Sequence, residues 1–215
     1  MSAERRNEQL DLLRSERAVA VLRADDADLA YDVACAVLEG GIRALEVTMT
    51  VPDASLVMTR LASIDGALVG AGTVLTAEEV DQCVDDGAHF IFSPTCCQDV
   101  VVRSKERDVP VIPGAMTPTE VLTAWRMGAD MVKVFPAARL GPAFLSDLRG
   151  PLPGIPLVPT GGITDENATD YLDAGAELLC LGSWLVNREL MSQGRLDEIT
   201  ERARSIRRIL DAYGG

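Results

Sequence analysis

Short runs of apolar residues alternate along the chain with longer amphipathic segments, and this alternation predicts an α/β fold. The runs are nearly continuous in Val, Ile, Leu and Ala, as expected for parallel strands buried on both faces. We predict eight strands, at residues 18–23, 44–49, 68–74, 90–94, 110–113, 131–135, 157–160 and 178–181. We predict helix starts between them at Asp25-Asp26, Thr76, Thr117-Pro118 and Thr164-Asp165. Eight strands alternating with helices indicate a closed (β/α)8 barrel.

An internal repeat supports this arrangement. The segments GIRALEV, GAHFIFS, GADMVKV and GAELLCL begin at Gly41, Gly87, Gly128 and Gly175, about two strand–helix units apart. Each glycine follows a helical segment, where a left-handed residue is favoured, and precedes a strand. Counting five residues on from each glycine gives Glu46, Phe92, Lys133 and Cys180. We therefore expect these four side chains to share one inward layer, with Glu46 and Lys133 on opposite strands.

Length and composition favour one domain. The chain has 215 residues, 47% of them hydrophobic, so we expect residues 1–215 to form a single TIM barrel with residues 1–17 as an N-terminal helix. It contains no apolar stretch typical of an export signal or a membrane span. Its five cysteines lack CxxC spacing, which favours a reducing cytoplasm over disulfides. The one histidine, His89, argues against a histidine-rich metal site.

The formal net charge of −13 makes nucleic acid and anionic membranes improbable partners. Any anionic substrate must therefore be attracted by a local site rather than by the overall field.

Lys133 is the strongest chemical signal. The chain has two lysines, and Lys105 lies in a polar helical segment whereas Lys133 lies inside the predicted strand MVKVF. Burying an ammonium is costly, and a desolvated lysine is what a Schiff-base nucleophile requires. Glu46, in the strand ALEVT, would be a buried carboxylate able to transfer protons beside it. The alternative at this level is a structural ion pair between the two.

Two glycine turns suggest an anion site. Thr160-Gly161-Gly162 ends the predicted seventh strand, and Gly182-Ser183 ends the eighth. The loops after these two strands commonly bind phosphate in such barrels, because glycine lets backbone N–H groups approach the anion. Simple turn formation is the alternative. Thr73, Pro94 and Phe135 complete the predicted rim of the barrel mouth.

In combination these motifs resemble the bacterial 2-keto-3-deoxy-6-phosphogluconate (KDPG) and 4-hydroxy-2-oxoglutarate (KHG) aldolases. The motifs are GGIRALEVT, GAGTVL, FSP, IPGAMTPTE, VKVFPA, VPTGGI and LGSWLV. The resemblance implies a class I aldolase on a (β/α)8 barrel, a homotrimer, and no metal or other cofactor. It implies that Lys133 forms the imine and that Glu46 is the proton shuttle.

The resemblance also implies how the substrate binds. Thr73, Pro94 and Phe135 would shape the pyruvyl pocket, and Thr160, Gly161, Gly162, Gly182 and Ser183 would hold a distal phosphate. The sequence departs from the family at Thr50, where the better-studied branch has an arginine expected to hold the substrate carboxylate. Thr50 remains a candidate substrate contact, and Arg23, at the end of the first strand, could supply the missing cation bidentately.

The expected reaction is reversible cleavage of a 2-keto acid, expected to be phosphorylated, to pyruvate and an aldehyde. KDPG would give glyceraldehyde 3-phosphate, and KHG would give glyoxylate. Two alternatives remain at this level: a phosphosugar isomerase or epimerase on a similar barrel, and a phosphosugar-binding barrel without catalysis. The first leaves Lys133 without an imine role, and the second does not explain two buried charges.

Overall fold

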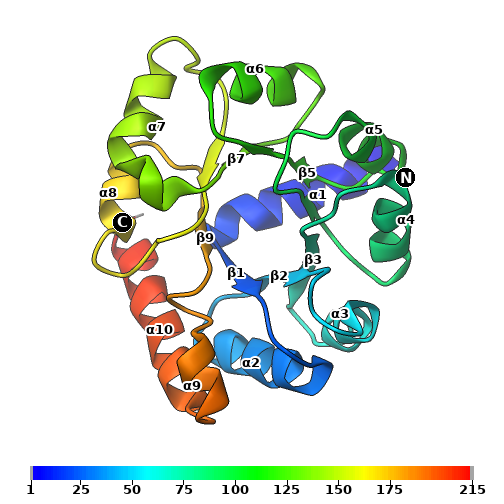
Figure 1. Cartoon of the computed structure of the whole chain (residues 1–215), viewed down its shortest axis with the longest axis vertical. Helices are drawn as coiled ribbons and strands as arrows, with labels where there is room; N and C mark the ends of the chain where they lie inside the picture. Colours follow the sequence, from blue (N-terminus) through cyan, green and yellow to red (C-terminus); the bar gives the residue numbers. More distant parts are fainter. Residues whose placement is uncertain (1, 214–215) are drawn as a thin grey trace.

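Eight parallel strands form the centre of the computed structural model, which describes residues 2–213 (Figure 1). The strands are β1 (Ala18–Leu22), β2 (Ala44–Thr48), β3 (Leu68–Gly72), β4 (Ile91–Phe92), β5 (Val111–Ile112) with β6 (Gly114–Ala115), β7 (Val132–Val134), β8 (Leu157–Pro159) and β9 (Leu179–Leu181). All of them except β6 lie within their predicted ranges, and β6 directly follows the predicted range 110–113. Most end one or two residues early, because the chain turns out of the sheet into the loops at the mouth.

The strands close into a barrel. β5, β4, β3, β2, β1 and β9 pair in that order, and β6, β7 and β8 form a second parallel sheet. β5 and β6 are two halves of one strand interrupted at Pro113, and the Lys133 N–H donates to the Pro113 carbonyl at 2.9 Å. A parallel bridge between Thr160 and Cys180 joins β8 to β9. The predicted TIM-barrel fold is therefore confirmed.

Helices surround the strand ring (Figure 1). Their bounds are α1 (Ser2–Glu16), α2 (Ala27–Glu39), α3 (Ala54–Ala62), α4 (Ala77–Asp85), α5 (Gln98–Glu106), α6 (Pro118–Arg126), α7 (Gly141–Arg149), α8 (Ala168–Asp173), α9 (Arg188–Ser192) and α10 (Leu196–Tyr213), with a 3-10 turn at Ala137–Arg139. In the described part of the chain none of these helices has the length and apolar character needed to cross a membrane.

Three of the four predicted helix starts are confirmed. Asp26 caps α2 by accepting a hydrogen bond from Leu29 N, and Thr76 and Thr117 form capping boxes with Glu79 and Glu120. The predicted start at Thr164-Asp165 is wrong.

The helix α8 begins only at Ala168, because the Asn167 side chain holds the preceding residues in a turn. Its Oδ1 accepts from Thr164 N, and its Nδ2 donates to the Gly162 carbonyl, both at 2.9 Å. The chain therefore makes a tied loop where we predicted a first helical turn.

The glycine repeat is confirmed by the backbone. Gly41, Gly87, Gly128 and Gly175 each lie two residues after the last residue of a helix, next to its C-cap, and have φ between 88° and 99°. This left-handed conformation is strained for any other residue type and ends each helix at the same point before the next strand. The four following strands therefore enter the barrel in one register.

Two apolar clusters fill the molecule. One lies between the strands and the outer helices, and the other fills the barrel interior with side chains such as Phe90, Phe92 and Met131. Leu10 and Leu13 of α1 belong to the interior cluster. Helix α1 runs across the ring in Figure 1 and closes its N-terminal end. The opposite, C-terminal end stays open for a site.

Candidate active site

Lys133 and Glu46 face each other inside the barrel. Lys133 lies on β7 and Glu46 on β2, and their Nζ and Oε1 atoms are 3.6 Å apart. Both residues are buried, with exposed fractions of 5% and 1%. The Lys133 Nζ also lies 5.4 Å from the ring centre of Phe92 and 5.5 Å from that of Phe135. The shared facing predicted from the repeat brings these two charges together.

The Glu46 carboxylate makes no hydrogen bond among the described residues. Both of its carboxylate oxygens are buried without a hydrogen-bond partner. Buried polar groups are nearly always hydrogen-bonded, so each exception calls for an explanation. A carboxylate left free beside a lysine can exchange protons with a molecule that enters between them.

Gly72 makes the space in which the Glu46 carboxylate lies. A Cβ added to Gly72 on the neighbouring strand β3 would be 2.0 Å from Glu46 Oε1. Only glycine at this position leaves room for the observed side-chain conformation. Gly72 belongs to GAGTVL, one of the motifs that carry the resemblance, and this motif thus contributes directly to the position of the carboxylate.

Cys180 belongs to the same layer but is chemically inert. Burial is the main cause that raises the pKa of its thiol to about 12, and the charge of Glu46 is the second. A thiol this basic stays protonated near neutral pH and is a poor nucleophile. Lys133 and Glu46 are therefore the reactive members of the layer, and Phe92 and Cys180 supply its apolar remainder.

A cavity of about 410 Å³ opens above this layer at the C-terminal end of the barrel. It has Lys133 and Glu46 in its lining. The other predicted site residues that line it are Arg23, Thr73, Pro94, Phe135, Thr160, Gly161, Gly182 and Ser183. Residues from β1, β2 and β7 and from the segments that follow β1, β3, β4, β7, β8 and β9 thus meet in one space large enough for a small organic acid.

Two predicted site residues lie outside the lining of this cavity, Thr50 and Gly162. The exposed Thr50 pairs its hydroxyl with the Thr48 hydroxyl at 2.9 Å, and Thr48 also donates to the Leu22 carbonyl. These bonds hold Thr50 in the turn after β2, beside the cavity and not in it. The Gly162 carbonyl accepts a hydrogen bond from Asn167 Nδ2, and Gly162 itself is not among the residues that line the cavity.

Thr73 adopts an unusual backbone conformation. Its φ is 61°, in the left-handed region that a β-branched residue rarely occupies. Such strain is concentrated at functional sites, where the surrounding fold holds it in place. Here it directs the chain after β3 so that Thr73 lines the cavity.

Arg23 supplies an unpaired cation at the cavity. It follows β1, is exposed, and makes no ion pair among the described residues. The glycine loops add backbone donors nearby. Gly161 and Gly162 have φ of 94° and 76°, and the N–H groups of Gly162 and Ser183 donate to no backbone carbonyl in the described chain. Free N–H groups and a free guanidinium suit an anionic ligand.

Sequence reasoning missed two charged residues of the lining, Asp25 and Arg188. Asp25 was read only as part of a helix start, and Arg188 gave no signal because it resembles any surface arginine. The apolar residues Val21, Ala24, Val186 and Met191 were also missed. Val21 and Ala24 lie within two residues of Arg23, and Val186 and Met191 come after Ser183, so closeness to predicted site residues is the signal that could have found them.

Other candidate features lie elsewhere. His89 precedes β4 at the closed end, and burial lowers its pKa while its Nδ1 lies 3.1 Å from the Val69 carbonyl. A groove of similar volume between α2 and α10 is lined by Asp32, Glu39 and Arg204 among others, and carries no buried reactive group. Among the described residues no group of three or more His, Cys, Asp or Glu side chains could hold a metal ion.

Comparisons with known proteins agree on one family. Residues 10–202 match the sequence profile of the aldolase family described as "KDPG and KHG aldolase". The chain is 35% identical to a 2-dehydro-3-deoxy-phosphogluconate aldolase of Treponema pallidum, covering 88% of this chain and 91% of that protein. It is 34% identical to the KHG/KDPG aldolase of Escherichia coli K12, covering 90% and 92%.

A solved structure matches equally well. It is the KDPG aldolase from Legionella pneumophila with pyruvate captured at low pH as a covalent carbinolamine intermediate. The two chains share 30% identity and a TM-score of 0.84, over 92% of this chain and 97% of that one.

Proposed function

The chain belongs to the KDPG and KHG aldolase family and is a class I carbon–carbon lyase, and we propose that it cleaves KDPG to pyruvate and glyceraldehyde 3-phosphate through an imine on Lys133. The observation that carries this assignment is the buried Lys133–Glu46 pair, 3.6 Å apart in the cavity lining. The glycine loops favour a phosphorylated substrate. KHG, which would give glyoxylate, is a second substrate of the same chemistry.

In the proposed first stage, the neutral amine of Lys133 attacks the 2-keto carbon. The carbinolamine that forms loses water and becomes an iminium ion. Glu46 lies close enough to Lys133 to accept the proton that the amine must lose and to help water leave, directly or through one water molecule. Phe92 and Cys180, in the same inward layer, make the surroundings of the pair apolar.

In the second stage, Glu46 removes the proton from the 4-hydroxyl group. The O–H electrons form the aldehyde C=O, the C3–C4 bond breaks, and its electron pair moves through C3 and C2 to neutralise the iminium nitrogen. The resulting enamine takes a proton at C3, and hydrolysis releases pyruvate and free Lys133. The same steps in reverse add pyruvate to an aldehyde.

The remaining cavity residues are proposed to hold the substrate. Arg23 pairs with the substrate carboxylate in place of the arginine that Thr50 replaces, and Thr73, Pro94 and Phe135 enclose the pyruvyl part. Thr160, Gly161, Gly182 and Ser183 hold the distal phosphate through backbone N–H and hydroxyl groups, and Gly162, next to the lining, adds its N–H. An unchanged KM for the keto acid in Arg23→Ala would remove Arg23 from this role.

We further propose that residues 1–215 act as one domain in a cytoplasmic homotrimer that takes only small-molecule substrates. Free cysteines support the compartment. Exposed apolar side chains at Leu75, Met116 and Trp125 support a contact surface between copies. Light scattering coupled to size-exclusion chromatography measures the number of chains directly.

The test of the imine is intact mass after incubation with pyruvate and sodium borohydride. The wild type should gain one reduced pyruvyl group, and Lys133→Ala should gain none and lose activity by more than about 10³-fold. Lys105→Ala is the matched control, because Lys105 is the other lysine of the chain and lies on α5 outside the cavity. A folded wild type without an adduct would overturn the imine and favour an isomerase that uses Glu46.

A further inference from the structure

Asp25 and Arg188 form an exposed ion pair at the mouth of the cavity. The Arg188 Nη2 donates to both carboxylate oxygens of Asp25, at 2.8 and 3.1 Å. Both side chains are well exposed, at 81% and 74%, and both residues line the cavity that contains Lys133. The exposed pair is therefore part of the entrance to this cavity.

The chain tethers Arg188 to the second glycine loop. The Gly182 carbonyl accepts from the N–H groups of Leu185 and Val186, which makes one tight turn after β9. Asn187 then caps α9 and donates from its side chain to the Ser183 carbonyl at 3.5 Å. Arg188 is the first residue of α9, so these bonds tie its backbone to the Gly182-Ser183 loop.

Arg188 has unused hydrogen-bonding capacity. Only its Nη2 is engaged, and its Nε and Nη1 donate to no partner among the described residues. An arginine presents five donors in a fork that matches a phosphate group, and hydrogen bonds between two charged groups are the stronger ones. The pair with Asp25 contributes little because it is exposed, and it occupies only one nitrogen of the fork. A phosphate dianion arriving beside Ser183 would therefore compete well for Arg188.

The overall charge makes such a cation significant. The chain carries a net charge of −13, and Lys133, Arg23 and Arg188 are the basic residues of the cavity lining. Lys133 is committed to the keto carbon. Arg23 follows β1, next to the strand that carries Glu46, and is proposed for the carboxylate. This leaves Arg188 as the side-chain cation for the other end of the substrate.

We propose that Arg188 binds the distal phosphate of the substrate and that Asp25 holds it at the mouth until the phosphate takes its place. Arg188 then determines specificity for phosphorylated over unphosphorylated 2-keto-3-deoxy acids, beyond what the glycine loops provide. This inference rests on the proposed aldolase function. In this exchange Asp25 competes with the phosphate for the Arg188 guanidinium.

The experiment compares cleavage of KDPG with cleavage of unphosphorylated 2-keto-3-deoxygluconate. Arg188→Gln should lower kcat/KM for KDPG about tenfold or more, and leave the value for the unphosphorylated acid within about twofold. Arg188→Lys should fall between, because it keeps the charge but loses the fork. Asp25→Asn should lower the KM for KDPG about two- to fivefold, since an exposed competing pair is lost.

Arg208→Gln is the matched control. Arg208 lies on α10, is exposed, and makes one long ion pair, with Glu201 at 3.6 Å. Replacing Arg208 should therefore leave the ratio of the two kcat/KM values unchanged. Equal losses for both substrates in Arg188→Gln, or no loss for either, would overturn the proposal. A higher KM for KDPG in Asp25→Asn would overturn the exchange with Asp25.

Borohydride trapping with pyruvate separates this inference from the aldolase function. Pyruvate carries no phosphate, so every variant at positions 25 and 188 should form the adduct at the wild-type rate. A wild type that neither traps pyruvate nor cleaves KDPG would reject the proposed function itself. A wild type that does both, with an unchanged substrate ratio in Arg188→Gln, would reject only the role of Arg188.

Discussion

The Lys133 nitrogen and a Glu46 oxygen lie 3.6 Å apart although their strands, β7 and β2, belong to different hydrogen-bonded sheets. No backbone hydrogen bond between the two strands fixes this distance. Closure of the barrel brings the inward layer together and so determines it. The chemistry of the site therefore depends on the whole strand ring.

Replacement of Glu46 by glutamine should separate imine formation from turnover. The amide keeps the shape of the side chain but cannot accept the 4-hydroxyl proton, so kcat for KDPG should fall about 10²- to 10⁴-fold. The pyruvate adduct should still form, at a lower rate, because Lys133 remains. Glu78→Gln, on the exposed first turn of α4, should leave both values unchanged. Wild-type kcat in Glu46→Gln would remove Glu46 from proton transfer.

The buried pair should lower stability in exchange for activity. Replacing a buried ion pair by well-packed apolar residues of similar volume often leaves the stability of a protein unchanged or raises it, because the two charges no longer have to be taken out of water. The double variant Lys133→Met/Glu46→Leu should therefore be as stable as the wild type or more stable, by up to about 4 kcal/mol, and inactive. Each single variant leaves one charge unpaired and should be less stable than the double variant. Urea unfolding measures the free energy of unfolding of the wild type, the two single variants and the double variant. A double variant less stable than both single variants would contradict this account.

Gly72→Ala should displace the Glu46 carboxylate. Its methyl group would lie 2.0 Å from Oε1, so the carboxylate must turn away from Lys133. A shift of about 1 Å at a reacting group can cost on the order of 10²-fold in rate, and we expect at least a tenfold loss of kcat. Gly154→Ala is the control, since nothing lies within 4 Å of its added methyl group. Equal activity of the two variants would refute the packing role of Gly72.

Asn167 should act as a positioning residue for the first glycine loop. Its side chain joins Thr164 N to the Gly162 carbonyl, and its removal frees this loop. Asn167→Ala should raise the KM for KDPG several-fold while pyruvate trapping stays at the wild-type rate, with a stability loss of about 1 kcal/mol. Asn7→Ala, exposed on α1, provides the comparison. A loss confined to stability would assign Asn167 a structural role alone.

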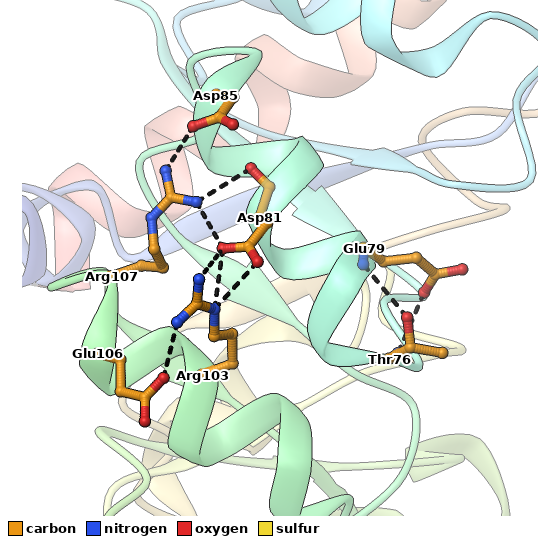
Figure 2. A network of polar contacts seen from close by, with 7 residues as sticks. All are labelled: Thr76, Glu79, Asp81, Asp85, Arg103, Glu106 and Arg107. Carbon is orange, nitrogen blue, oxygen red and sulfur yellow. Dashed lines mark hydrogen bonds and ion pairs between the residues drawn. The ribbon is translucent and has the colours of Figure 1, made fainter.

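The α4–α5 contact should make the fold sensitive to acid. Hydrogen bonds from Arg103 and then Arg107 lower the pKa of Asp81, which joins the two helices (Figure 2). A folded-state pKa below the unfolded one adds stability above about pH 4, and this is lost as the pH falls through the folded pKa.

Asp81→Asn should therefore melt lower than the wild type near neutral pH, and the difference should shrink toward pH 3. The effect should be small and weaker in high salt, because Asp81 is not buried. Melting temperatures from pH 7 to pH 3 measure it. A difference that grows on acidification would have the wrong sign.

The reactive centre could be predicted because it follows from register. Strand side chains alternate strictly, so the glycine repeat was enough to assign Glu46 and Lys133 to one inward layer. The same logic failed at the mouth, where the chain leaves the strands. Thr50 is held aside by the Thr48 hydroxyl, and Asp25 and Arg188 meet only through the pairing of β1 with β9.

The wrong helix start has a similar cause. Thr164-Asp165 is a plausible cap by residue type, but the Asn167 side chain binds Thr164 N and the Gly162 carbonyl and so holds this segment in a turn. Side-chain hydrogen bonds that compete with a helix depend on contacts three to five residues away. Residue preference therefore predicted that a helix would start here but not the residue at which it starts.

The interruption at Pro113 and the isolated bridges between β8 and β9 divide the strand ring into a six-stranded part that carries Glu46 and a three-stranded part that carries Lys133. A partly folded chain that has formed only one of these parts holds one half of the reacting pair. During refolding, recovery of turnover should consequently lag behind recovery of helical signal, because non-local strand pairing forms late. Enzymatic activity thus reports the last step of folding, in which the six-stranded and three-stranded parts join.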